Sequence, residues 1–144
     1  MILAVDIGNT NIVVGCIKGE EICFVERMST EATRTELEYA ISFKNVLEMY
    51  GISIEQLDGG IISSVVPPVT NIVKRSVEKI LNTEVMLIGP GVKTGLNILM
   101  DDPRQVGSDR IVNAVAVVHE YPVPAAIIDM GTATTICVVD EKKN

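Results

Sequence analysis

One phrase occurs twice in the chain, as AVDIGNTNIVVG at residues 4–15 and as AIIDMGTATTICVV at residues 126–139. Each copy is an apolar run that ends in an aspartate, followed two residues later by a glycine, short polar residues and a second apolar run. Asp6 thus corresponds to Asp129, and Gly8 corresponds to Gly131. Two apolar runs joined by a short polar turn predict a β-hairpin, so two similar hairpins are expected.

The chemistry of this phrase suits a phosphate group. An aspartate at the end of a buried strand is costly unless a cation matches its charge. The glycine removes the side chain where a phosphate can approach backbone N–H groups. A single copy of this phrase is also typical of an ordinary hairpin turn that binds no ligand. Two copies that converge across a cleft can hold a nucleotide's phosphates from both sides, with the aspartates binding the neutralising cations.

The composition narrows the class of protein. Apolar residues make up 47% of the 144 residues but aromatics only 3%, so aliphatic side chains must form the core, as in strands buried on both faces. The net charge of −7 argues against a general nucleic-acid-binding protein. No apolar run reaches the length of a membrane span and no basic leader opens the chain, so a soluble cytoplasmic protein is expected. Three cysteines are predicted to be buried free thiols: Cys16, Cys23 and Cys137.

The first half of the chain predicts a meander followed by a helix. Apolar runs over residues 2–8, 11–18 and 21–28, separated by short turns, indicate three antiparallel strands. Thr35 and Glu38 form a capping box that opens a helix through about Tyr50, where Gly51 ends it. The expected apolar face of this helix is Leu37, Ala40, Ile41, Leu47 and Tyr50.

The second half alternates strands and helices. Helical periodicity over residues 69–81 lies between two short strand-like runs, at residues 60–66 and 84–88. Residues 89–107 form a loop with a possible short strand at 96–100. Ser108 is the expected N-cap of a helix that continues to about residue 118, and a hairpin follows at residues 126–140.

This order of elements predicts an α/β fold. A three-stranded meander extended by helix-linked strands gives a ribonuclease H-like mixed sheet with helices on both faces. That first domain is expected to span residues 1–124. Residues 125–144 are then the first strand pair of a second, similar domain that is truncated after its first hairpin.

The segment Gly107–Arg110 carries a third chemical signal. An acid in the first turn of a helix is ordinarily a favourable partner for the helix dipole. Here Asp109 follows a glycine-rich loop and stands beside Arg110. The carboxylate can accept the proton of an attacking hydroxyl, and the guanidinium can bind an anionic substrate group.

With these stretches together, the chain resembles the type III pantothenate kinases, within the superfamily of acetate and sugar kinases, heat-shock chaperone ATPases and actin. The resemblance extends along the whole chain in order and spacing. It rests on Asp6-Ile7-Gly8-Asn9-Thr10, Gly89-Pro90-Gly91-Val92-Lys93-Thr94-Gly95-Leu96, Gly107-Ser108-Asp109-Arg110 with Asn113-Ala114-Val115-Ala116, and Asp129-Met130-Gly131-Thr132-Ala133-Thr134-Thr135.

The resemblance implies ATP-dependent phosphorylation of pantothenate, the first step of coenzyme A biosynthesis. The implied ATP-binding residues are Asp6, Ile7, Gly8, Asn9, Thr10, Asn11, Ile12 and Val13 of the first hairpin and Thr132 of the second. Asp6 would lie near Mg²⁺, and Asp129 would bind a monovalent cation, K⁺ or NH₄⁺. The implied pantothenate site is Gly107, Ser108, Asp109, Arg110 and Met100, with Asp109 as the general base.

Two departures from the family pattern stand out. Met100 occupies a position where the family often has tyrosine. Family members are also about twice as long and act as homodimers of two-domain chains, so the 144-residue piece alone is expected to have little kinase activity. Two other readings stay open: a sugar or acetate kinase or phosphatase of the same superfamily, and a non-catalytic nucleotide-binding regulatory protein.

Overall fold

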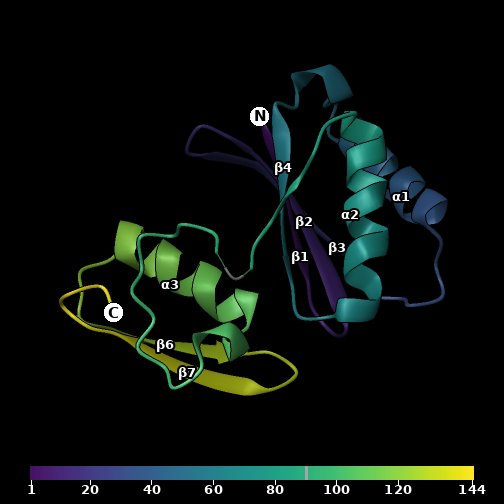
Figure 1. Ribbon diagram of the computed structural model, residues 1–144. Coiled ribbons are helices and arrows are strands. Elements are labelled where there is room, and N and C mark those ends of the chain that lie inside the picture. Colours follow the sequence, from purple (N-terminus) through teal and green to yellow (C-terminus); the bar gives the residue numbers. More distant parts are fainter. Residues whose placement is uncertain (90) are drawn as a thin grey trace. The chain divides into compact units, whose positions relative to one another are not determined.

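A computed structural model describes residues 1–89 and 91–144, apart from the side chain of Arg104 (Figure 1). Pro90, within the glycine-rich motif at residues 89–96, lies outside the described residues. The chain forms two compact units, Met1–Ile88 and Gly89–Asn144.

The first unit is built on a five-stranded mixed sheet. Its strands are β1 (Ile2–Ile7), β2 (Asn11–Lys18), β3 (Glu21–Ser29), β4 (Gly59–Ser64) and β5 (Met86–Leu87). They lie in the order β3-β2-β1-β4-β5. The pairs β1–β2 and β2–β3 are antiparallel, which confirms the predicted meander, whereas β4 runs parallel to β1 and β5 parallel to β4. The last strand is shorter than the predicted run 84–88.

One helix follows β3 in the chain and a second one connects the parallel strands β4 and β5. In α1 (Glu36–Met49) the predicted capping box is present: the Glu38 backbone N–H donates to Thr35 Oγ1 at 3.4 Å, and the Thr35 N–H donates to Glu38 Oε2 at 2.7 Å. Gly51 follows in the left-handed region at φ +66°, as expected for the end of a helix. A 3₁₀ turn (Ile54–Gln56) leads into β4. The second helix, α2 (Pro67–Leu81), opens with proline in its first turn and contains the predicted periodic stretch.

The core of this unit lies on one face of the sheet. Alternate residues of the central strands point into it, and α1 and α2 both pack against that face (Figure 1). Its largest fully buried side chains include Leu3, Ile7, Ile12, Val14, Tyr39, Phe43, Leu47, Ile62, Val69, Val73 and Val77. The prediction of helices on both faces is therefore not met within this unit.

The apolar face predicted for α1 is partly wrong. Ala40 and Leu47 are buried as expected, but Leu37 is 59% exposed and Ile41 50% exposed. Tyr39 and Phe43 occupy the core instead, each fully buried. An aromatic side chain buries more area than an aliphatic one, provided that any polar group is satisfied. The Tyr39 hydroxyl meets that condition, because it lies 2.9 Å from both the N–H and the C=O of Glu31.

The cysteines are free thiols, as predicted, but only Cys16 is fully buried. A register shift between β2 and β3 occurs at Cys16, which pairs with Phe24, while Ile17 pairs with Ile22. The extra residue, Cys23, therefore joins Phe24 on the core side, as a β-bulge allows. The Cys16 Sγ contacts the Met1 Sδ at 3.8 Å.

The buried thiol makes stability sensitive to alkaline pH. Burial and the neighbouring Cys23 thiol raise the pKa of Cys16 above its usual 9.0. Above pH 9.0 the unfolded chain loses this proton more readily than the folded chain does, so ionisation favours unfolding. We expect this contribution to be constant below pH 9.0 and to fall as the pH rises further. Urea unfolding of the wild type and of Cys16→Ala at pH 8 and pH 10.5 measures it; an equal alkaline loss in both would contradict the assignment.

The second unit consists of one helix and one hairpin. Its elements are a 3₁₀ turn (Pro103–Gln105), α3 (Ser108–Glu120), β6 (Ala125–Met130) and β7 (Thr134–Val139). The predicted hairpin is confirmed, with β6 and β7 antiparallel. The N-cap of α3 is Gly107 rather than Ser108, which is the first helical residue and is buried.

The short strand expected at residues 96–100 does not form. That stretch lacks regular structure, and its apolar side chains Leu99 and Met100 are 69% and 56% exposed. An extended segment needs a neighbouring strand for its backbone groups, and the two described sheets contain none for this stretch. Across the described residues, no helix combines the length and apolar character needed to span a membrane.

Candidate functional site

The first Asp-x-Gly turn connects β1 and β2 in the first unit. Asp6 pairs with Val13 near the end of the two strands, and the Gly8 N–H donates to the Asn11 carbonyl at 3.0 Å, which closes the turn. A Cβ atom at Gly8 would lie 3.1 Å from that carbonyl oxygen, which is tighter than nine in ten real Cβ contacts. Glycine therefore avoids a tight backbone contact at this position. The side chains of Asp6, Asn9 and Thr10 are exposed at the turn.

The second Asp-x-Gly turn connects β6 and β7 in the second unit. Asp129 pairs with Thr135, and the Gly131 N–H donates to the Ala133 carbonyl at 3.3 Å. A Cβ at Gly131 would meet that carbonyl oxygen at 3.8 Å and Asp129 Oδ1 at 3.9 Å, which are ordinary contacts. The repeated phrase thus builds two hairpins with three-residue connections, but only in the first would a side chain in place of the glycine meet a tight contact.

Asp129 has a side-chain partner that the sequence did not identify. Asn113, in the middle of α3, donates from Nδ2 to Asp129 Oδ2 at 3.2 Å. This bond joins the helix to the hairpin and orients the carboxylate. Asn113 belongs to the motif that follows Gly107–Arg110. It is a polar residue within an apolar stretch of the helix, and this pattern could have indicated its role from the sequence.

The segment Gly107–Arg110 forms the N-terminus of α3. The Arg110 N–H donates to Asp109 Oδ1 at 2.7 Å and lies 3.1 Å from the Gly107 carbonyl. Asp109 and Arg110 are both half-buried. The carboxylate therefore sits at the positive end of the helix with one oxygen fixed by a backbone amide.

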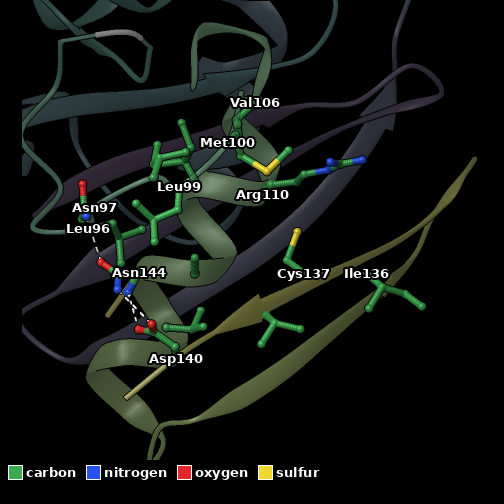
Figure 2. Close-up of a pocket in the computed structure, with 15 residues that line it drawn as sticks. Leu96, Asn97, Leu99, Met100, Val106, Arg110, Ile136, Cys137, Asp140 and Asn144 are labelled. Atoms are coloured by element: carbon green, nitrogen blue, oxygen red, sulfur yellow. Dashed lines mark hydrogen bonds between the residues drawn. The ribbon is translucent and has the colours of Figure 1, made fainter. Parts of the chain in front are cut away.

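A cavity of about 380 Å³ lies beside this helix terminus in the second unit. Most of its wall is apolar and comes from the loop at residues 96–100, from α3 and from β7. Arg110 supplies positive charge to the wall. Figure 2 shows Met100 and Arg110 toward one end of the cavity and Asn97 and Asn144 toward the other. The structure thus brings together two of the five predicted pantothenate-site residues in one cavity wall.

Three hydrogen-bonded polar residues, Asn97, Asp140 and Asn144, line the other end of the cavity. The Asn144 side chain donates to Asp140 Oδ2 at 2.8 Å and accepts from the Asn97 side chain at 2.9 Å (Figure 2). The Asn144 backbone N–H donates to Asp140 Oδ1 at 2.9 Å. These bonds from Asn144, together with the Lys142 N–H, hold the pKa of Asp140 below its usual range.

The carboxylates of both turns suit hard cations, which prefer oxygen ligands. Within residues 1–89 and 91–144, no three His, Cys, Asp or Glu side chains gather into a candidate metal cluster. Asp6 and Asp129 would therefore each contribute a carboxylate to a site with few protein side-chain ligands. Such a site fits an ion that takes its other ligands from backbone carbonyls, water and substrate phosphates, as Mg²⁺ commonly does.

The predicted site residues divide between the two units. Residues 6–13 belong to the first unit, whereas Met100, Gly107–Arg110, Asp129 and Thr132 belong to the second. Convergence of the two hairpins on one ligand stays a prediction.

An α/β protein with two Asp-x-Gly hairpins and an acid at a helix N-terminus falls in the class of candidate phosphate-binding proteins. Comparison with known proteins narrows this class. The family model for type III pantothenate kinase matches residues 2–144. The chain therefore belongs to the type III pantothenate kinase family.

Individual relatives agree with this assignment. The chain is similar to proteins named type III pantothenate kinase from Brevibacillus brevis, with 49% identity over 142 residues, and from Halalkalibacterium halodurans, with 46% identity over 143 residues. Each match covers 99% of this chain and 56% of the relative. A third, from an Exiguobacterium species, is 47% identical over 143 residues, with the same coverage. The chain spans about half the length of the curated relatives that it matches.

Proposed function

We propose that the chain is part of a longer protein, since it spans about half the length of its relatives. We further propose that this longer protein, called the complete product below, transfers the γ-phosphoryl group of ATP to pantothenate and forms 4'-phosphopantothenate for coenzyme A biosynthesis. The observation that carries this proposal is the family match over residues 2–144, supported by relatives at 46–49% identity. Three of the four motifs quoted from the sequence fall at a hairpin turn, a helix N-terminus and a second hairpin turn. These are positions where backbone N–H groups and side chains are available to a ligand.

The first hairpin is the proposed ATP phosphate site, formed by residues Asp6 through Val13. The tight space at Gly8 supports this role, since a glycine there keeps the turn compact where a phosphate would approach. Asp6, exposed at the end of β1, is the proposed magnesium ligand. When bound, Mg²⁺ would neutralise charge on the phosphates.

The second hairpin is proposed to complete the nucleotide site through Thr132 and to bind K⁺ or NH₄⁺ through Asp129. The Asn113 side chain supports the second role because it fixes the Asp129 carboxylate from α3. Thr132 lies at the exposed tip of the turn, within reach of solvent and of a ligand.

Asp109 is the proposed general base. It would accept the proton of the primary hydroxyl of pantothenate while that oxygen attacks the γ-phosphorus in line and ADP leaves. The bond from the Arg110 N–H to Asp109 Oδ1 supports this role, since an oriented carboxylate can be positioned against one hydroxyl. Arg110 would bind the carboxylate of pantothenate, and Met100 would give apolar contact in the same cavity wall, with Gly107 and Ser108 completing the site.

We also propose a ribonuclease H-like first domain over residues 1–124. The strand order β3-β2-β1-β4-β5, with an antiparallel meander followed by parallel strands, supports this architecture. Residues 125–144 are proposed to begin a second, similar domain, because their hairpin repeats the connection between β1 and β2. Cytoplasmic location and a homodimer of the complete product complete the proposal.

The outer face of the β6–β7 hairpin supports a second domain. Ile128 pairs with Ile136 across the hairpin, and these side chains are 61% and 65% exposed. Met130 and Val138, on the same face, are 82% and 68% exposed. A hairpin with one apolar face uncovered is marginal in water by itself.

Replacement of Ile136 by serine is therefore expected to have different effects in the 144-residue chain and in the complete product. In the 144-residue chain, Ile136→Ser is expected to reduce binding of an apolar dye such as ANS without loss of stability. In the complete product, the same change is expected to cost about 2–4 kcal/mol of unfolding free energy if Ile136 is buried there. The exposed Ile22→Ser is the matched control. Equal unfolding free energies of wild type and Ile136→Ser in the complete product would contradict the proposed packing.

The function is tested with purified complete product, Mg-ATP, a potassium salt and pantothenate. We expect ADP release that depends on pantothenate, with phosphopantothenate detected by mass spectrometry. Acetate and a panel of sugars should give no ADP above background. Release with a sugar or acetate but not with pantothenate would favour another kinase of the superfamily, and nucleotide binding without any turnover would favour a regulatory protein.

A further inference from the structure

The turn between β1 and β2 is hydrogen-bonded to Thr30, a residue outside the sequence motifs. Thr30 directly follows β3 and is half-buried. Its Oγ1 donates to the Gly8 carbonyl at 2.7 Å, and its backbone N–H donates to the Thr10 carbonyl at 3.0 Å. Two carbonyls of the three-residue connection are thus held by one threonine from a neighbouring strand.

These bonds determine which way the peptide units of the turn face. In a trans peptide unit the C=O and the following N–H point in opposite directions. Because the Gly8 carbonyl points toward Thr30, the N–H of Asn9 points away from Thr30. Rotation of this unit would place a carbonyl oxygen, rather than an N–H donor, on the side away from β3. A carbonyl oxygen on that side would repel an anionic phosphate, whereas the N–H of the observed arrangement attracts it.

We propose that Thr30 is a positioning residue for ATP binding: its hydroxyl holds the Gly8–Asn9 peptide so that the Asn9 N–H faces the phosphates of the nucleotide. This inference rests on the proposed function, which places the ATP phosphates at this turn. Thr30 itself does not contact the nucleotide. Its effect is transmitted through one hydrogen bond to the backbone of the turn.

Three variants of the complete product separate this role from a general loss of stability. Thr30→Val keeps the shape of the side chain and removes the donor, whereas Thr30→Ser keeps the donor. Ser76→Ala is the matched control, since the Ser76 hydroxyl also bonds a backbone carbonyl of another element, that of Glu36 at 2.8 Å, in the α1–α2 contact. Thr30→Ala, which lacks both the methyl group and the hydroxyl donor, replaces Thr30→Val in these measurements if Thr30→Val does not fold.

The measured quantities are the Kd for Mg-ATP by calorimetry and the KM for pantothenate. One neutral hydrogen bond corresponds to about a 3- to 10-fold change in an equilibrium constant, so Thr30→Val is expected to raise the Kd for ATP by that factor. The KM for pantothenate should stay unchanged, and Thr30→Ser and Ser76→Ala should bind ATP as the wild type does. An unchanged Kd in Thr30→Val, or an equal rise in Ser76→Ala, would overturn the proposal.

Amide hydrogen exchange of the 144-residue chain gives a second measurement that does not depend on catalysis. The Gly8 N–H, which bonds the Asn11 carbonyl across the turn, should exchange about 3- to 10-fold faster in Thr30→Val. Unchanged exchange would overturn the role of Thr30 in holding the turn. If the wild type binds ATP but does not phosphorylate pantothenate, the proposed reaction fails while the Kd comparison still decides the role of Thr30. If the wild type does not bind ATP, both fail.

Discussion

Asp109→Asn in the complete product is expected to lower kcat by about 100- to 10,000-fold, the range in which a positioned general base contributes. Asparagine has the same shape and keeps an oxygen that can accept the Arg110 N–H, so the N-terminus of α3 should stay intact. The amide cannot take the proton of the substrate hydroxyl. Steady-state kinetics should therefore show a low kcat with nearly unchanged KM values for ATP and pantothenate.

The matched control for this variant is Asp101→Asn. Asp101 is an exposed carboxylate in the loop before α3, and the same chemical change there should leave kcat within about twofold of the wild type. If Asp109→Asn also kept its kcat within about twofold, the proton would have another acceptor. A large rise in both KM values with constant kcat would instead assign Asp109 to substrate binding.

Phe43→Ala is expected to destabilise the first unit by about 3–5 kcal/mol, as other large-to-small changes in protein cores do. Phe43 is fully buried in the layer between α1 and the sheet, and its ring lies 6.2 Å from that of Tyr39, centroid to centroid. Its removal leaves a cavity at the centre of the core. Urea unfolding followed by circular dichroism measures the loss, which is a large fraction of the stability of an ordinary domain.

Leu37→Ala, on the same helix, distinguishes the observed core face from the one predicted by periodicity. Leu37 is 59% exposed, so its truncation should change stability by no more than about 0.5 kcal/mol. A loss at Leu37 as large as that at Phe43 would mean that the predicted face is the buried one.

The difference between these two residues shows what periodicity can and cannot predict. The boundaries of α1 were predictable because the Thr35–Glu38 capping box and Gly51 are local signals that act within a few residues. The buried face was not, because α1 carries apolar residues around most of its circumference. Which of them meet the sheet depends on the packing of the unit and on a local detail, the satisfaction of the Tyr39 hydroxyl by Glu31.

In the sheet, too, local features were predictable from the sequence and non-local ones were not. The meander was predictable because short turns bring sequence neighbours into antiparallel pairs. The bulge that places Cys23 on the core side was not, since a single extra residue leaves no pattern of its own.

For the candidate site, the sequence predicts the chemistry of each segment. It does not predict the hydrogen bonds that hold these segments in place. The two Asp-x-Gly phrases form the expected hairpins, and Met100 and Arg110 lie in one cavity wall. The bonds from Asn113 to Asp129 and from Thr30 to Gly8 join residues that are 16 and 22 positions apart. Such pairs depend on tertiary packing rather than on any local spacing.

We propose that the turn at Asp6 and the turn at Asp129 hold one nucleotide between them. A crystal structure of the complete product with Mg²⁺ and a non-hydrolysable ATP analogue tests it most directly. We predict that the residues of both turns contact the phosphates or the ions of the same analogue. A bound analogue that contacts one turn, with the other turn remote from it, would contradict the account.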